Sequence, residues 1–184
     1  MIEYAASKHK PMVLATGIAT EEDIQLAVEA CRRMGNNDIT VLKCTSSYPA
    51  PVEEANLCMI RDLAERFQVK SGLSDHTLGS VSPIVAVTQG ASMIEKHFIL
   101  NRSIGGPDCS FSMEEKDFAQ MVKDVRMAEL SLGKTTYELT EKMRGSRSAS
   151  RSLYVAEDMK AGEVITERNV RSVRPLSLIH ISEP

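Results

Sequence analysis

The chain has 184 residues, carries 22 Lys and Arg against 25 Asp and Glu for a formal charge of −3, and is 42% apolar, an ordinary globular composition. This acidic balance and an aromatic content of 4% argue against a basic, base-stacking surface, so we expect no nucleic-acid partner. No run reaches the roughly 20 apolar residues of a membrane span, so we expect no membrane partner. The start, MIEYAASKHK, lacks the apolar stretch of a secretion signal, so we expect a cytoplasmic location and reduced cysteines.

Strands and helices are predicted to alternate along the first part of the sequence. Apolar runs bounded by glycine or polar residues predict strands at 11–17, 39–44, 69–74 and 93–98. Amphipathic or apolar stretches predict helices at 20–35, 57–67 and 78–90, and a long helix is expected from 112 to 133. Thr20 with Asp23, and Ser112 with Glu115, have the spacing of the capping box that begins a helix.

The spacing of the predicted strands indicates the fold class. They begin near residues 12, 39, 69 and 92, so consecutive starts are 27, 30 and 23 residues apart. This is the length of a βα unit and indicates an α/β fold with parallel strands. An open doubly wound sheet and a (β/α)8 barrel both fit. Because a complete barrel takes roughly 250 residues, four units would form half of one and would leave two strand edges exposed.

The composition changes after Gly133. We interpret the three segments beyond it as a polar linker, part of a small β-rich module and a non-native tail, at 134–151, 152–175 and 176–184. Within the module, two strands are expected at 152–155 and 163–166, with a turn between them.

Polar side chains gather where two predicted strands end, which is where parallel α/β barrels place their catalytic groups. The third strand leads into Ser-Asp-His at 74–76, and the fourth into Glu-Lys-His at 95–97. Because side chains alternate along a strand, the serine and histidine of the first motif share a face with the glutamate and histidine of the second. Two imidazoles, of His76 and His97, should therefore converge.

Two histidines beside a carboxylate form a candidate site for Mn²⁺, Mg²⁺ or Zn²⁺ with open positions for water or substrate. The alternative is that His76 caps a turn and that His97 is an interior histidine with satisfied hydrogen bonds. Weaker candidates are Ser46 and Tyr48, for a polar substrate, and Asp108 in a glycine-rich loop. Taken alone, each of these three is better explained by ordinary loop or turn chemistry.

Five motifs in this order carry a family resemblance: KPMVLATG, KCTSSYPAP, GLSDHT, IEKHF and GGPD, at 10–17, 43–51, 72–77, 94–98 and 105–108. Together they resemble the sialic acid synthase family, nonulosonate synthases that use phosphoenolpyruvate. Within that family, the motifs and the segment 151–175 are most similar to the bacterial pseudaminic acid synthases. The resemblance covers about residues 2–175.

The resemblance implies a TIM barrel followed by an antifreeze-like (SAF) domain, in a domain-swapped homodimer in which one subunit's small domain covers the other's active site. This sequence would then supply the C-terminal half of the barrel (1–133), the linker and part of the SAF domain, as a fragment that is inactive alone. It departs from the family at 149–152, where Ala-Ser-Arg-Ser replaces the usual Phe-Arg-Arg-Ser, and beyond residue 175, where the usual Gly-rich segment does not follow.

The resemblance also implies roles for individual residues. His76 and His97 resemble the ligands of a divalent metal, Mn²⁺ or Mg²⁺, and Glu95 resembles a catalytic carboxylate close to the reacting water. The implied substrate contacts are Ser46 and Ser74 to phosphoenolpyruvate, Tyr48 and Asp108 to the acceptor sugar, and Arg174 to the sugar in the neighbouring subunit.

The implied reaction is a transferase reaction that condenses phosphoenolpyruvate with an acetamido sugar, 2,4-diacetamido-2,4,6-trideoxy-L-altrose, to give pseudaminic acid and phosphate. Three alternatives stay open. One is an N-acetylneuraminate or legionaminate synthase of the same family, a second is another metal-dependent aldolase on the same barrel, and the third is a non-catalytic carbohydrate-binding fragment. Sugar binding by 152–175 alone would favour the third, and turnover without phosphate release would favour the second.

Overall fold

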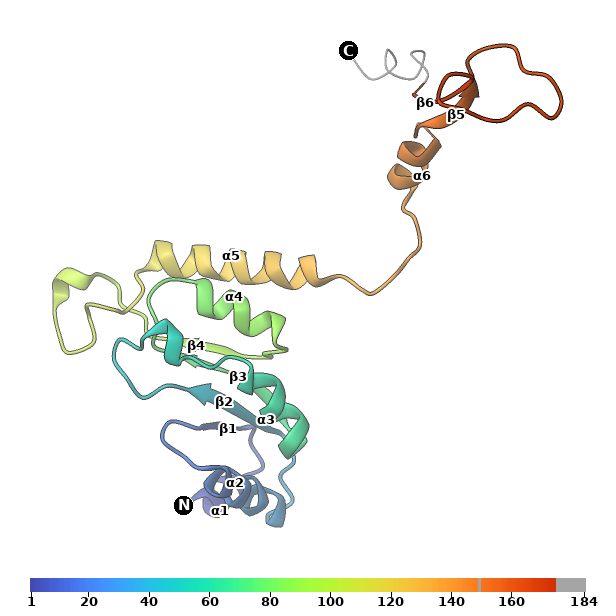
Figure 1. The fold of residues 1–184 in the computed structure, drawn as a ribbon. Coiled ribbons are helices and arrows are strands. Elements are labelled where there is room, and N and C mark those ends of the chain that lie inside the picture. Colours follow the sequence, from blue (N-terminus) through green and yellow to red (C-terminus); the bar gives the residue numbers. More distant parts are fainter. Residues whose placement is uncertain (149, 175–184) are drawn as a thin grey trace. The chain divides into compact units, whose positions relative to one another are not determined.

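A computed structural model describes residues 1–148 and 150–174 of the chain. The chain divides into two units after Gly133. The first unit is built on one parallel sheet that curls like the wall of a half barrel, as Figure 1 shows. Its strands lie side by side in chain order: β1 (Met12–Ala15), β2 (Ile39–Cys44), β3 (Lys70–Asp75) and β4 (Ile94–Lys96). The predicted α/β fold with parallel strands is confirmed.

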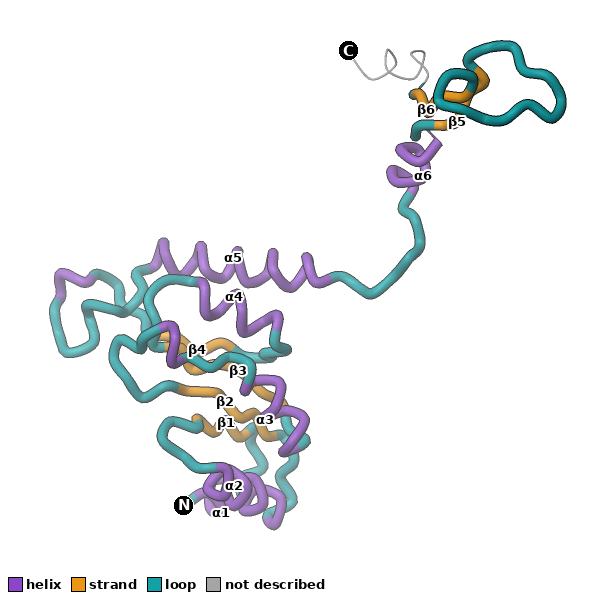
Figure 2. The backbone as a smooth tube through the Cα atoms, viewed as in Figure 1, coloured by secondary structure: helices purple, strands orange, loops and turns teal. Residues whose placement is uncertain are grey.

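Helices connect the strands and cover one side of the curled sheet (Figure 2). They are α1 (Ile2–Ala6), α2 (Glu21–Arg33), α3 (Met59–Phe67), α4 (Val81–Thr88) and α5 (Glu115–Leu132), with single 3-10 turns at Val52–Glu54 and Arg102–Ile104. The short α1 was not predicted, because five residues give too little apolar periodicity to detect.

The register of the strands divides their side chains between two faces. Ile39 and Val41 of β2 are buried among apolar side chains of α1, α2 and α3. Leu73 of β3 and Ile94 of β4 are paired in register and pack with residues of α3 and α4. Because neighbours along a strand point to opposite faces, Ser74 and Glu95, which are also paired, lie on the face away from the helices.

One predicted capping box is confirmed and the other is wrong. Thr20 and Asp23 form the reciprocal bonds at the start of α2. At α5 the N-cap position is instead taken by Glu114, whose carboxylate accepts the backbone N–H of Arg102 at 2.8 Å. The Ser112 hydroxyl donates to the Asp108 carbonyl at 2.7 Å, so it belongs to the preceding loop.

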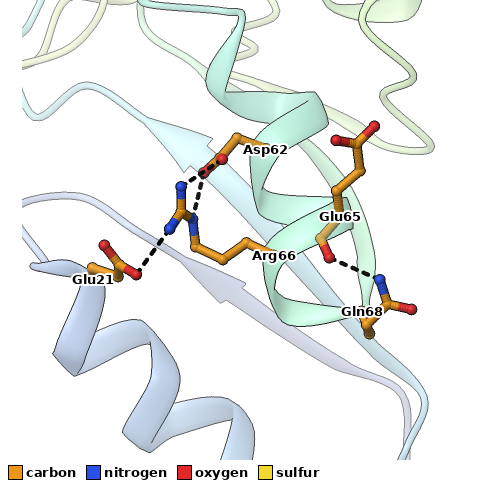
Figure 3. Close-up of polar contacts among 5 residues, drawn as sticks. All are labelled: Glu21, Asp62, Glu65, Arg66 and Gln68. Carbon is orange, nitrogen blue, oxygen red and sulfur yellow. Dashed lines mark hydrogen bonds and ion pairs between the residues drawn. The ribbon is translucent and has the colours of Figure 1, made fainter.

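A small ionic network joins α3 to α2 (Figure 3). The Arg66 guanidinium donates to both carboxylate oxygens of Asp62, one turn earlier in α3, and to Glu21 of α2. The hydrogen bonds from Arg66 lower the pKa of Asp62. At the end of α3, Gln68 adopts a left-handed conformation and its side chain donates to the Glu65 carbonyl at 2.7 Å.

The second unit, from Lys134 onward, contains one helix and a two-stranded antiparallel sheet: α6 (Glu141–Ser148), β5 (Ser152–Val155) and β6 (Val170–Val173). The segment interpreted as a linker thus includes a helix, whose first turn is capped by Thr140. No helix in the described part of the chain is long and apolar enough to cross a membrane.

The predicted strand at 163–166 is wrong, although β5 has its predicted bounds. The Asn169 amide donates to the Val164 carbonyl and its oxygen accepts the Thr166 N–H, which folds this segment into a turn. The strand β5 pairs instead with β6. The interpreted tail, 176–184, lies outside the described residues.

Candidate functional site

The ends of β3 and β4 bring the two predicted histidines together. The ring centres of His76 and His97 are 5.1 Å apart, and their planes are inclined at 71°. The Tyr48 ring, from the loop after β2, lies 4.2 Å from that of His76 and 5.9 Å from that of His97. Three consecutive strand ends therefore contribute to one cluster of rings.

A backbone carbonyl determines which nitrogen of His76 carries the proton. Nδ1 of His76 lies 2.9 Å from the carbonyl oxygen of Thr45. Because a carbonyl can only accept, Nδ1 carries the hydrogen in this bond, and the lone pair of a neutral ring is at Nε2. A second bond, from Ala50 N to the His76 carbonyl at 2.9 Å, ties the same two loops together. The imidazole is thus held with one nitrogen available to bind a ligand.

The predicted alternation places a serine and a carboxylate on the histidines' side of the sheet. The hydroxyl of Ser74, which is 4% exposed, donates to Oε1 of Glu95 at 2.7 Å. The Glu95 residue is exposed, so its other carboxylate oxygen is accessible to a bound molecule. Ser74 therefore orients a carboxylate of β4, two residues before His97.

The helix-facing side of the same strand ends carries a buried ion pair. Lys96 Nζ lies 2.6 Å from Asp75 Oδ2, and the two side chains are 2% and 1% exposed. Lys96 also donates to the Thr77 carbonyl at 2.6 Å, and Asp75 accepts the Thr77 N–H at 2.9 Å. The two motifs therefore place different networks on the two faces, as the strand alternation predicts.

The other predicted site residues come from several parts of the chain. Asp108 Oδ2 is 3.8 Å from His97 Nδ1, too long for a hydrogen bond but close enough to attract a protonated imidazole. Ser46 is exposed, and its hydroxyl lies beside Gly17 at the end of β1. Arg174 is exposed in the second unit, directly after β6.

One contributing side chain was not predicted. Phe111 is 6% exposed, and its ring centre is 4.9 Å from that of His97 and 6.0 Å from that of Tyr48. Its position just after the GGPD loop, which itself follows a strand end, was the available signal. The Thr45 carbonyl carries no side-chain signal, so sequence reasoning could not find it.

The chain matches one protein family over most of its length. Residues 1–137 match the NeuB family. The chain belongs to the NeuB family.

Several NeuB relatives are similar over nearly the whole chain. The pseudaminic acid synthase of Helicobacter pylori is 48% identical over 181 residues, which cover 98% of this chain and 53% of that protein. The N,N'-diacetyllegionaminic acid synthase of Legionella pneumophila is 33% identical over 187 residues, covering 99% of this chain and 52% of that protein. The chain spans about half the length of the curated relatives it matches.

The fold is also shared with a solved NeuB-like structure. The crystal structure of N-acetylneuraminic acid synthetase from Leptospira borgpetersenii, in complex with citrate, superposes with a TM-score of 0.73 at 31% identity. The match covers 80% of this chain and 51% of that one. The resemblance to nonulosonate synthases and the half-barrel sheet are both confirmed.

The two imidazoles have the separation expected for ligands of one ion. With metal–nitrogen bonds of about 2.1 Å, two imidazoles in neighbouring coordination positions have ring centres roughly 5 Å apart, and those of His76 and His97 are 5.1 Å apart. A pocket of about 260 Å³ adjoins them, lined by residues 74–76 and 95–97. In the described part of the chain, no cluster of three or more His, Cys, Asp or Glu has metal-binding geometry. The imidazoles of His76 and His97 can supply two nitrogen ligands to one ion.

Proposed function

We propose that this chain is the C-terminal part of a pseudaminic acid synthase. The reaction joins phosphoenolpyruvate to 2,4-diacetamido-2,4,6-trideoxy-L-altrose, giving pseudaminic acid and phosphate. The observation that carries the proposal is the convergence of His76 and His97, with Nε2 of His76 available, beside the Ser74–Glu95 pair. The 48% identity to a pseudaminic acid synthase, against 33% to a legionaminic acid synthase, favours this acceptor over the alternative one.

His76 and His97 would hold a divalent ion, Mn²⁺ or Mg²⁺. When bound, the ion supplies Lewis-acid polarisation of the sugar aldehyde oxygen. Two nitrogen ligands suit Mn²⁺ better than Mg²⁺, which prefers oxygen. The Thr45 carbonyl contributes by fixing the tautomer and the orientation of the His76 ring, as outer partners of metal-binding histidines commonly do.

The carbon–carbon bond forms when C3 of phosphoenolpyruvate attacks the sugar aldehyde carbon. The π electrons of the aldehyde C=O move to its oxygen, which takes up a proton and becomes a hydroxyl. C2 then gains positive character, water adds there, and phosphate leaves with cleavage of its C–O bond. Glu95 would orient this water or accept its proton; the hydrogen bond from Ser74 to one of its carboxylate oxygens and the exposure of the residue support this role. The neighbouring rings of Tyr48 and Phe111 would keep water away from other positions in the site.

Substrate contacts complete the proposal. Ser46 and Ser74 would contact phosphoenolpyruvate, while Tyr48 and Asp108 would contact the acceptor sugar from the two sides of the histidine pair. The second unit would be part of an SAF domain, and Arg174 would reach the sugar in the other subunit of a domain-swapped homodimer. The chain alone would be inactive, and the enzyme would work in the cytoplasm without nucleic-acid or membrane partners.

The test uses the full-length protein that contains this chain, purified without metal and then supplied with Mn²⁺. Phosphoenolpyruvate is offered with the altrose derivative, with N-acetylmannosamine, or with the corresponding legionaminate precursor, and phosphate and nine-carbon acid are measured together. Equal amounts of both products, with the altrose derivative preferred, are expected. Preference for another sugar would assign a different nonulosonate synthase, and turnover without phosphate release would contradict the proposal.

A histidine variant and a matched control connect the reaction to the site. His76→Ala should abolish metal-dependent turnover, because it removes one of two nitrogen ligands. His9→Asn is the control, since His9 is exposed and has a positive φ of 51° that asparagine tolerates. His9→Asn should retain full turnover. Activity retained in His76→Ala would remove that residue from the metal site.

A further inference from the structure

A buried ion pair lies directly behind the histidine pair. The side chains of Lys96 and Asp75 are 2% and 1% exposed, and Nζ is 2.6 Å from Oδ2. Each of these residues immediately precedes a histidine of the candidate site, Asp75 before His76 and Lys96 before His97. Their side chains point to the helix-facing side of the sheet, whereas the imidazoles meet on the other side.

The ammonium group of Lys96 contacts the residues on both sides of His76. It contacts the carboxylate of Asp75 and donates to the carbonyl of Thr77 at 2.6 Å. The other oxygen of Asp75 accepts the Thr77 N–H at 2.9 Å, and the Thr77 hydroxyl donates to Ser82 at 3.0 Å. The three-residue segment around His76 is therefore held from behind by one cation that belongs to the neighbouring strand.

This arrangement is specific to a charged donor. A buried ion pair contributes little net stability, because removing two charges from water offsets their attraction, and an apolar pair of similar volume can hold two strands together as well. An apolar side chain at position 96 could not bond the carboxylate of Asp75 and the carbonyl of Thr77 at the same time. The contacts of Lys96 therefore explain how the backbone around His76 is held in place better than they explain the stability of the protein.

We propose that Lys96 and Asp75 are positioning residues that hold the backbones of His76 and His97 in register, so that both imidazoles can bind the same ion. The inference rests on the proposed metal site. It predicts that disturbing the ion pair weakens metal binding even though neither side chain touches the metal or the substrates.

The test measures the dissociation constant of Mn²⁺ by electron paramagnetic resonance in the full-length protein. Replacing Lys96 alone would leave the Asp75 charge buried and endanger folding, so the main variant is Asp75→Asn combined with Lys96→Met. The matched control is Asp38→Asn combined with Lys70→Met, which removes an exposed Lys–Asp pair with a distance of 2.9 Å at the other end of β3.

We expect the buried-pair variant to bind Mn²⁺ about 10- to 100-fold more weakly, to keep the wild-type urea midpoint, and to regain turnover at high Mn²⁺. The exposed-pair control should bind Mn²⁺ like the wild type. Wild-type affinity in the buried-pair variant, when His76→Ala has lost binding, would overturn this inference and leave the proposed function intact. Unchanged Mn²⁺ binding in His76→Ala would overturn both.

A second variant covers the outcome in which the double variant does not fold. Asp75→Glu keeps both charges and lengthens the carboxylate side chain by one methylene, which displaces the contact behind His76. We expect the Mn²⁺ dissociation constant to rise about 10-fold. A folded Asp75→Glu variant with unchanged Mn²⁺ affinity would also refute the positioning role.

Discussion

Gly72, in the middle of β3, is the position where a single methyl group should disturb both the sheet and the site. A Cβ at this position would meet the carbonyl oxygen of Met93 closer than any real Cβ contact, and would lie 2.7 Å from Cδ2 of Leu42. The Leu42 side chain can turn away. The Met93 carbonyl cannot move away, because it accepts the N–H of Leu73 at 2.9 Å, where β3 pairs with the residue before β4.

The cost of Gly72→Ala follows from these contacts. Overpacking of a close-packed interior costs about 1–3 kcal/mol, and loss of the Leu73–Met93 hydrogen bond adds about 1 kcal/mol. We expect the free energy of unfolding to fall by about 2–4 kcal/mol. Because β4 must move away from β3, the Ser74–Glu95 hydrogen bond should also lengthen, and turnover should fall in the protein that remains folded.

The assay is urea unfolding of the full-length protein, followed by circular dichroism. Gly145→Ala is the control, because Gly145 lies in α6 and, apart from its chain neighbours and the adjacent helix backbone, no described residue has a heavy atom within 4 Å of its Cβ position. That change should stabilise α6 by up to about 1 kcal/mol and leave the barrel transition unchanged. A wild-type urea midpoint in Gly72→Ala would refute the close approach of β3 to the residue that precedes β4.

Three further predictions use groups elsewhere in the first unit. The pKa of Asp62 in the folded state is below its ordinary value of 3.8, because Arg66 donates hydrogen bonds to its carboxylate. The stabilising effect of this carboxylate is therefore present above pH 3.8 and is lost as the pH falls below that value. Asp62→Asn should reduce the loss of stability in acid urea titrations, and an unchanged acid profile would contradict this. Glu95→Gln should lower kcat by about 10²–10⁴-fold while Mn²⁺ affinity is retained, and a wild-type kcat would exclude Glu95 as the base. In peptide mapping after thiol labelling, exposed Cys58 should react before Cys31, whose burial raises its pKa, and the reverse order would contradict the packing of α2.

The parts of the fold that sequence predicts well depend on local rules. The bounds of β2 were predicted without error, because a short segment dominated by Ile39, Val41 and Leu42 and bounded by polar residues is typical of a strand buried on both faces of a sheet. The meeting of His76 and His97 followed from two rules alone, the alternation of side chains and the parallel direction of the strands. Neither rule requires knowledge of distant contacts.

The parts that sequence did not predict depend on bonds between distant segments or on the main chain. At the start of α5, the carboxylate of the N-cap residue Glu114 accepts a backbone N–H from 12 residues earlier in the chain, a bond that the local Ser112–Glu115 spacing could not reveal. The tautomer of His76 is fixed by the Thr45 carbonyl, and every residue has a carbonyl. The strand predicted at 163–166 failed because its apolar pattern lacked a partner strand.

The proposed reaction depends on one divalent ion bound by the imidazoles of His76 and His97. Its most direct test is electron spin echo envelope modulation of Mn²⁺ bound to the full-length protein labelled with ¹⁵N-histidine. We expect couplings to two histidine nitrogens, with one lost in His76→Ala and the other lost in His97→Ala. Bound Mn²⁺ without histidine nitrogen couplings would contradict it.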